Sequence, residues 1–255
     1  MSILRVQRAA FRDALANRRS FWVQVLVMAV NDVTWVIFWA MFFNAVGNVR
    51  GWDRDDVLML FAILLTASGV ALGLVGNARK LGQLVADGEI DAALALPLDP
   101  LSFLLARRVD TVLLGDLLTG PLLFIYASDR SLTSFALYAA GALCGSVVLI
   151  GFLVSISSLT LFVGGRGEQA DLGFQAILIM ASYPLDIFGG PTKVVLFTLI
   201  PAAFVTGLPA SLLRDFDLGT ALALTGSAAF FSLLGITLFR LGLRRYASGA
   251  VWTRA

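Results

Sequence analysis

The sequence predicts an all-α protein that crosses a membrane several times. Of its 255 residues, 58% are hydrophobic and 14% are charged, whereas a soluble domain is about half apolar and about a quarter charged. The apolar residues are gathered in long runs, and a run of about 20 residues is long enough to cross a bilayer as a helix. No polar stretch is long enough to form a second domain, so we expect residues 1–255 to form one transmembrane domain.

Composition also excludes several classes of function. A chain this apolar is neither a water-soluble enzyme nor a disordered protein, and a net charge of +2 gives no reason to expect a nucleic acid as partner. The chain has no histidine, which excludes Ser–His catalysis and histidine-ligated metals. It also lacks the G-x-x-x-x-G-K-[ST] motif that holds a nucleotide. We therefore expect no catalytic site, no metal and no cofactor bound by this chain.

Residues 1–19 are predicted to form an amphipathic helix in the plane of the membrane. On a helical wheel one face carries Arg5, Arg8 and Arg12. The roughly opposite face carries the apolar residues, namely Ile3, Val6, Ala10 and Ala14, with Phe11 at its edge. Such a helix lies on the inner leaflet with its arginines among anionic headgroups. The simpler alternative is a positively charged anchor.

Six membrane-crossing helices are predicted. We place them at about 21–46, 57–76, 103–126, 134–163, 171–188 and 219–239. Arginines are concentrated before the first span and after the last, so both termini are expected to be cytoplasmic, which requires an even number of crossings.

That even number decides how the region before the last span is assigned. It holds two apolar runs interrupted by prolines, and only one of them can cross. We assign the crossing to 171–188 and a re-entrant outer element, with Pro201 and Pro209, to 190–213, because irregular backbone inside a bilayer must be shielded by protein. The alternative is that 194–213 crosses instead.

The connection between the second and third spans, residues 78–100, is too polar to cross the membrane and too regular for an unstructured loop. Its apolar residues Leu81, Leu84 and Val85 have the spacing of one helix face. Gly88 ends this helix, and a second short element follows. The side chains expected to contact a cytoplasmic partner are Lys80, Gln83, Leu84, Asp87, Glu89 and Asp91. The alternative is a solvated hairpin without a partner.

Two acidic residues fall inside predicted spans. A charge at the centre of a bilayer costs at least about 2.5 kcal/mol, so Asp32 and Asp116 either line a polar pathway or form hydrogen bonds to another helix. Asp116 follows Arg108 by eight residues, which in a continuous helix would place it about 12 Å deeper.

Small residues recur at helical spacing in two places. These are Gly69 with Gly73 and Gly141 with Gly145, a spacing that allows helices to approach closely. It fits packing within the chain and packing between subunits equally well.

The segment that follows the second span resembles a signature of one branch of the type-2 ATP-binding-cassette (ABC) permeases. Gly88–Asp110, GEIDAALALPLDPLSFLLARRVD, is similar to the branch's "G-x-(L/I)-D … L … P-L … R-x-D" stretch. Ser182–Phe188, Ile200–Phe204 and Pro209–Ala210 are similar to its "Y-P … I-F … I-P-x-A-F-x … P-A" run. With the six-span arrangement, the resemblance covers essentially the whole chain.

The resemblance implies a permease subunit of an exporter in the bacterial plasma (inner) membrane. Two permease subunits, the same chain twice or two paralogues, would associate with two copies of a separate cytoplasmic subunit that binds ATP and Mg. It also implies an in-plane N-terminal helix, a coupling helix at 78–100 and a re-entrant element before the sixth span. The main alternative is an ion-driven secondary transporter, which favours conspicuous ionisable groups in the membrane. Only Asp32, Asp116 and the marginal Asp186 qualify.

Overall fold

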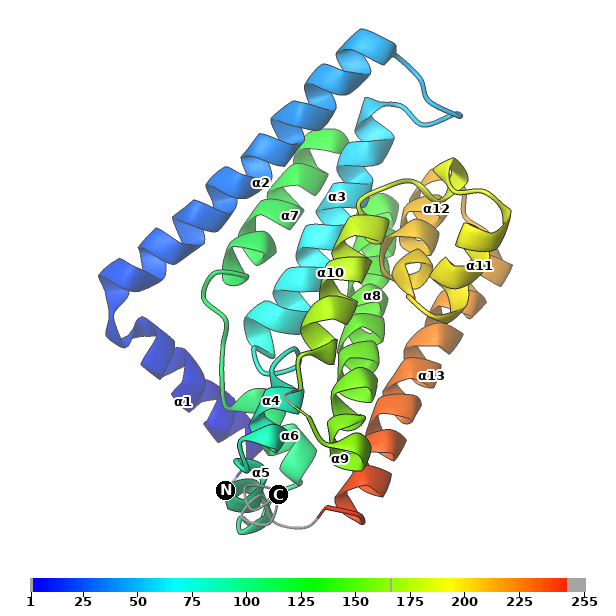
Figure 1. The fold of residues 1–255 in the computed structure, drawn as a ribbon. Helices are drawn as coiled ribbons and strands as arrows, with labels where there is room; N and C mark the ends of the chain where they lie inside the picture. The colour runs from blue at the N-terminus through cyan, green and yellow to red at the C-terminus, as the bar shows by residue number, and fades with distance from the viewer. Residues whose placement is uncertain (1, 166, 247–255) are drawn as a thin grey trace.

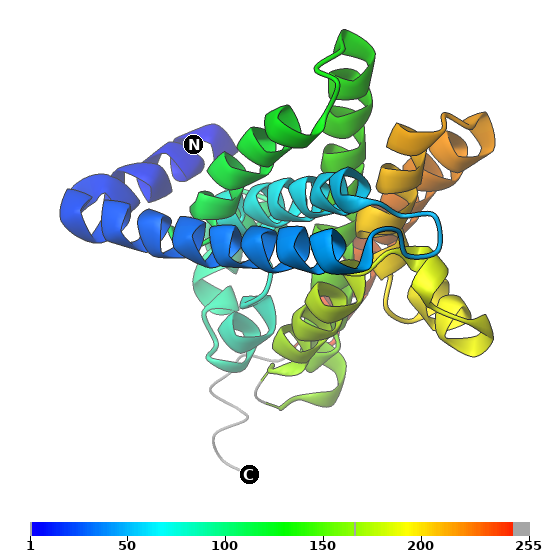
Figure 2. The ribbon, with the colours of Figure 1, turned by 90° about the horizontal axis from the view of Figure 1, so that it is seen from above.

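The structure is a computed structural model that describes residues 2–165 and 167–246. It is 78% helical, and the described residues form no strand, which confirms the all-α class. The helices run between two ends of an elongated bundle, with α1 and α4 at one end and α11 and α12 at the other (Figure 1). Seen from above, α1 and α11 lie on opposite sides of the molecule (Figure 2).

Helices α2, α3, α7, α8, α10 and α13 run between the two ends, and shorter elements connect them (Figure 1). In chain order the elements are α1 Ile3–Ala16, α2 Arg18–Val46, α3 Arg54–Ser68, the π-helix η1 Gly69–Leu74, α4 Leu81–Ala86, α5 Ile90–Leu94, α6 Pro100–Ala106, α7 Leu114–Ala127, α8 Leu132–Ser158, α9 Thr160–Val163, α10 Gln169–Ala181, the 3₁₀ turn η2 Leu185–Ile187, α11 Gly190–Thr198, the π-helix η3 Ala203–Gly207, α12 Leu208–Arg214 and α13 Leu218–Leu243.

Polar residues fix where the long helices begin. The side chains of Asn17, Asp53, Ser131 and Asp217 each accept a hydrogen bond from a backbone N–H in the first turn of the helix that follows. These N–H groups have no partner within the helix, so such caps stabilise the start. At Asp217, the backbone and side-chain hydrogen bonds from Thr220 lower the pKa of the carboxyl group. The caps therefore stabilise the N-terminal ends of α2, α3, α8 and α13.

Within the described residues, four helices are long and apolar enough to cross a membrane, counting α3 with η1 and α8 with α9 as single spans. The segment of α11, η3 and α12 would be a fifth, but it is bent by 83°. Helices α7 and α10 are apolar and shorter. The number of six crossings therefore stays a prediction.

The region of the predicted third span, 103–126, is not one helix. Helix α6 ends at Ala106, and α7 begins at Leu114. Between them the backbone runs beside the end of η1, where the Asp110 N–H donates to the Gly73 carbonyl (3.0 Å) and the Gly76 N–H donates to the Arg108 carbonyl (3.0 Å). Because the chain is not helical here, the 12 Å depth expected for Asp116 does not apply.

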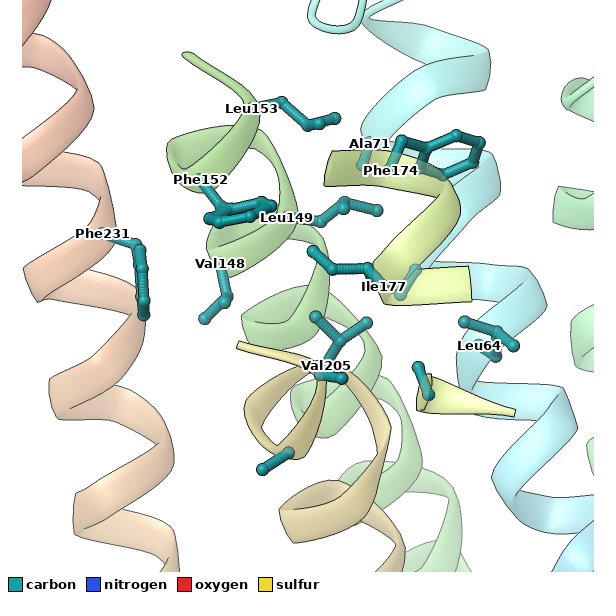
Figure 3. Packing of buried hydrophobic residues seen from close by; sticks show 14 of the residues in the cluster. Leu64, Ala71, Val148, Leu149, Phe152, Leu153, Phe174, Ile177, Val205 and Phe231 are labelled. Carbon is teal, nitrogen blue, oxygen red and sulfur yellow. The ribbon is translucent and has the colours of Figure 1, made fainter. Parts of the chain in front are cut away.

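Helix α8 is the centre of the bundle. It contacts α3, α10, α12, η3 and α13. Leu149 and Leu153 on α8 are fully buried, and Phe152 packs between α10 and Phe231 of α13 (Figure 3). By contrast, only 17% of the most apolar stretch of α2 is buried, against 78% for the span formed by α3 and η1. Helix α2 is therefore a peripheral helix with a largely uncovered apolar surface.

Both predicted small-residue pairs lie at contacts within the chain. A Cβ atom at Gly69 would lie 2.6 Å from the backbone nitrogen of Leu117 in α7. A Cβ atom at Gly145 would lie 2.5 Å from the carbonyl oxygen of Val205 in η3. Backbone approaches this close need glycine, so these pairs are explained by packing within one subunit.

Candidate functional site

The predicted coupling segment lies at the end of the bundle that also holds α1 and α9 (Figure 1). It forms two short helices, α4 and α5, separated by Gly88 with φ of +75°. On α4, Leu81 and Val85 are buried against Leu161 and Phe239, while Leu84 is half-buried. The apolar side of α4 therefore attaches the segment to α8 and α9.

Polar contacts attach α4 to α10 as well. The Arg79 guanidinium forms a 2.8 Å ion pair with Asp171 and lies 5.2 Å from the ring centre of Phe174. The Gln83 side chain donates a hydrogen bond to the other oxygen of Asp171 (3.2 Å). Asp171, in the first turn of α10, is therefore held by two side chains of the coupling segment and the turn before it.

Five of the six predicted contact residues surround one polar pocket of about 380 Å³. The pocket is lined by Asn77, Lys80, Gln83, Leu84, Asp87, Glu89, Arg107 and Arg108. Asp87 and Glu89 are exposed, although Glu89 forms an ion pair with Arg107. Asp91, the sixth residue, is half-buried and does not line the pocket.

Sequence reasoning missed Asn77, Arg107 and Arg108 at this pocket. Nothing in the local spacing signals that residues 20 positions after the coupling helix fold back onto it. The Asn77 side chain donates to the Leu104 carbonyl (2.7 Å), which fixes α6 beside the start of the coupling segment. The polar surface is therefore built from both ends of the connection.

Helix α1 packs against α6, at the end of the bundle that also holds α4 (Figure 1). Val6 and Ala10 are buried, and the Gln7 side chain donates to the Leu74 carbonyl at the end of η1 (2.5 Å). The arginine face is exposed, as its polarity requires. Much of the apolar face thus contacts protein rather than lipid, and the in-plane position of α1 stays a prediction.

A second cavity, of about 270 Å³, lies between α2, α3, α7 and α10. Its wall from α2 is Met28, Asn31, Asp32, Trp35 and Trp39, and its other walls are Phe61, Leu64, Leu65, Ser68, Leu113, Asp116, Phe174, Leu178, Ile179, Ser182 and Tyr183. The residues from α2 recur every three or four positions, so the helical spacing of an acid and two tryptophans is a signal that sequence reasoning could have used.

Both predicted intramembrane acids line this cavity. Asp32 is 3% exposed and accepts a hydrogen bond from the Thr119 hydroxyl of α7. Asp116 is 2% exposed, and its Oδ1 atom has no hydrogen-bond partner. The structure therefore brings the two acids to one site and leaves one carboxylate oxygen unpaired.

Two further polar atoms at the cavity are unpaired. The indole N–H of Trp39 and the hydroxyl of Ser68 are buried and have no hydrogen-bond partner. A buried polar group without a partner costs about 1–3 kcal/mol. Buried polar groups are normally paired with protein, ordered water or a bound molecule, so three unpaired groups make this cavity a candidate binding site.

The predicted re-entrant element occupies the opposite end of the molecule. Pro201 is buried at the bend between α11 and η3, and Pro209 packs against Gly141 of α8. The η2 turn that precedes the element is tied to the α2–α3 loop because Asp186 accepts a hydrogen bond from the Trp52 indole (3.0 Å). Asp186 itself is exposed, so it contributes no buried charge to the bundle.

A protein family described as ABC-2 family transporter protein matches residues 29–250 of this chain. The match runs from the middle of α2 past the end of α13, and it therefore includes the polar pocket beside α4 and every lining residue of the cavity with the two acids except Met28. No curated protein and no solved structure matches the chain.

Proposed function

Because this chain belongs to the ABC-2 family of transporter proteins, we propose that it is the permease subunit of an exporter driven by a separate ATP-binding subunit. The permease would lie in the inner membrane of a bacterium with both termini in the cytoplasm. ATP and Mg would be bound by the partner, and this chain would supply the path for the substrate.

The observation that carries this proposal is the mechanical connection from the coupling segment to the cavity. Helix α4 is joined to Asp171 of α10 through Arg79 and Gln83. Helix α10 then supplies Phe174, which faces the cavity and also contacts Arg79. A subunit that pushes on α4 would therefore move a wall of the cavity, which is the step that alternating access requires.

The uncovered side of α2 supports a second permease subunit, either the same chain or a paralogue. Its exposed apolar residues include Trp22, Val23, Leu26, Val27, Val30, Val33, Trp35, Ile37, Phe38 and Met41. Lipid alone could cover such a surface, but the cavity also has exposed lining residues here, Trp35 from α2 and Ile179 from α10. A second subunit on this side would close the cavity toward lipid.

An ion-driven secondary transporter is the second candidate, and the buried Asp116 with its unpaired Oδ1 atom favours it, because such transporters carry buried ionisable groups. The two functions differ in what accompanies the permease. Solute movement along an ion gradient by a preparation free of any ATP-binding subunit would support the second candidate.

The test of the first candidate uses the exposed Asp87 of the coupling surface. The tagged chain is purified in mild detergent from its native membrane, and the co-purifying ATP-binding subunit is quantified for wild type, Asp87→Arg and Asp129→Arg. Both aspartates are exposed, but Asp129 lies in the α7–α8 loop at the opposite end. Substitution at the exposed Asp87 changes the free energy of unfolding by only about 0.5 kcal/mol, and loss of the hydrogen bond that Asp129 accepts from the Ser131 N–H (3.2 Å) costs about 1 kcal/mol.

We expect wild type and Asp129→Arg to recover the ATP-binding subunit equally. Asp87→Arg should recover several-fold less, because reversing a charge at an interface places like charges together. Equal recovery from both variants would contradict the assignment of the coupling surface.

A further inference from the structure

The cavity between α2, α3, α7 and α10 holds two acidic side chains that no basic side chain among the described residues neutralises. Asp116 is 2% exposed, and its Oδ1 atom has no partner. It lies in the first turn of α7, where free backbone N–H groups favour a negative charge. Asp32 adds a second carboxylate to the same wall, whereas no lysine or arginine lines the cavity. Two carboxyl groups and no basic side chain line the cavity, so it favours a bound cation over an anion.

The walls define the rest of that molecule. Aromatic side chains from α2, α3, α10 and the segment after α10 line the cavity, namely Trp35, Trp39, Phe61, Phe174 and Tyr183. The faces of such rings attract cations and also pack against flat apolar groups. A bare metal ion would need about six oxygen ligands, and among the described residues no three acidic, cysteine or histidine side chains are grouped to hold one. The walls fit an organic cation.

Its position suits a transported molecule. Asp32 lies 14 residues after Arg18, the first residue of the 29-residue α2, which is about 21 Å along the helix and close to its middle. Trp35, Ile179 and Tyr183 line the cavity and are exposed, so the cavity is reached from the surface between α2 and α10. Helix α10, which borders this opening, also carries the Asp171 that contacts Arg79 and Gln83.

From these observations we infer that the cavity binds the substrate of the proposed exporter, and that this substrate is an organic cation: a protonated amine attached to an aromatic or similarly flat apolar body. The amine pairs with Asp116, the rings of Trp35 and Trp39 enclose the body, and acceptor atoms on the body are met by the Trp39 indole N–H. The assignment of a substrate rests on the proposed function, whereas the assignment of a binding site stands on the cavity.

Binding is measured by titration calorimetry on the purified permease with whatever subunit accompanies it. The probes are 1-naphthylmethylammonium and its uncharged counterpart 1-naphthalenemethanol, which have nearly the same shape. We expect the amine to bind wild type at least tenfold more tightly, because a hydrogen bond to a charged group contributes about 1.5–3 kcal/mol. Equal affinity for the two probes would overturn the proposal.

Two variants with matched controls locate the site. Asp116→Asn should abolish the preference for the amine, and Asp129→Asn, the same change at an exposed loop, should retain it. Trp35→Leu tests the aromatic wall without depending on a buried residue, since Trp35 is 48% exposed. It should weaken amine binding about 3- to 30-fold, the range for a cation over an aromatic ring, whereas Trp22→Leu on the same helix should not.

The outcomes separate this inference from the proposed function. An amine preference that survives both Asp116→Asn and Trp35→Leu would overturn the site. A complex that contains the ATP-binding subunit but binds the two probes equally would overturn the substrate class and leave the exporter intact. A preparation without that subunit that still prefers the amine would leave the site intact and overturn the exporter.

Discussion

At the scale of single residues, close backbone approach is what orders the bundle. Gly145 of α8 faces the carbonyl oxygen of Val205 in η3, whereas Gly226 of α13 has nothing within 4 Å of the position of a Cβ atom. The two glycines occupy similar helices, but only one is required by its neighbour. They therefore form a matched pair for testing the packing.

We predict opposite effects from the same substitution at these two positions. Gly145→Ala should lower the midpoint of thermal denaturation in mild detergent, because forcing a methyl group into a filled contact costs about 1–3 kcal/mol. Gly226→Ala should leave the midpoint unchanged or raise it, since alanine is favoured over glycine in a helix by about 0.5–1 kcal/mol. A stabilised Gly145→Ala variant would show that η3 does not pack on α8 as described.

The two intramembrane acids could be identified from the sequence because charge is costly inside an apolar run. Their meeting could not, because it depends on α7 beginning at Leu114 and on α2 crossing beside α3. The unpaired state of Asp116 Oδ1 is a property of the assembled cavity. Single-residue chemistry was therefore predictable here, but the site was not.

At the scale of elements, the positions of α2, α3, α8 and α13 follow closely from the runs of apolar residues, since each run is longer than a span and is bounded by polar caps. The break between α6 and α7 does not follow from hydropathy. Its cause is tertiary. The Asp110 N–H donates to the Gly73 carbonyl and the Gly76 N–H donates to the Arg108 carbonyl, so these groups bond between two segments instead of within a helix.

We predict that the bent segment formed by α11, η3 and α12 enters and leaves the membrane on the same side. Gly189 precedes α11 and Asp215 follows α12, and both are exposed. In a Cys144→Ala background, which removes the chain's one cysteine, Gly189→Cys and Asp215→Cys should both react with a membrane-impermeant maleimide added to intact cells. Ala92→Cys in the exposed side of α5 should react only after permeabilisation. Reaction of the cysteine at 189 but not of that at 215 would mean that the pair crosses the membrane.

At the scale of the whole molecule, the peripheral position of α2 joins the observations. The apolar surface of α2 is uncovered, and exposed residues of α2 and α10 line the cavity. Helix α10 also carries the Asp171 that pairs with Arg79. Composition predicted the membrane class, and the resemblance at residues 88–110 predicted the family that the match over 29–250 identifies. The position of a second subunit could not be predicted, because the pattern of apolar residues in one sequence does not distinguish a surface that faces another chain from one that faces lipid.

The most direct test of the proposed exporter is the mass of the intact complex, measured by native mass spectrometry after purification from the native membrane in mild detergent. We predict a complex of two permease chains and two copies of an ATP-binding subunit. Each permease chain would be this one, of 27.3 kDa, or a paralogue of it. A particle that contains permease chains alone, and that still moves solute along an ion gradient, would contradict it.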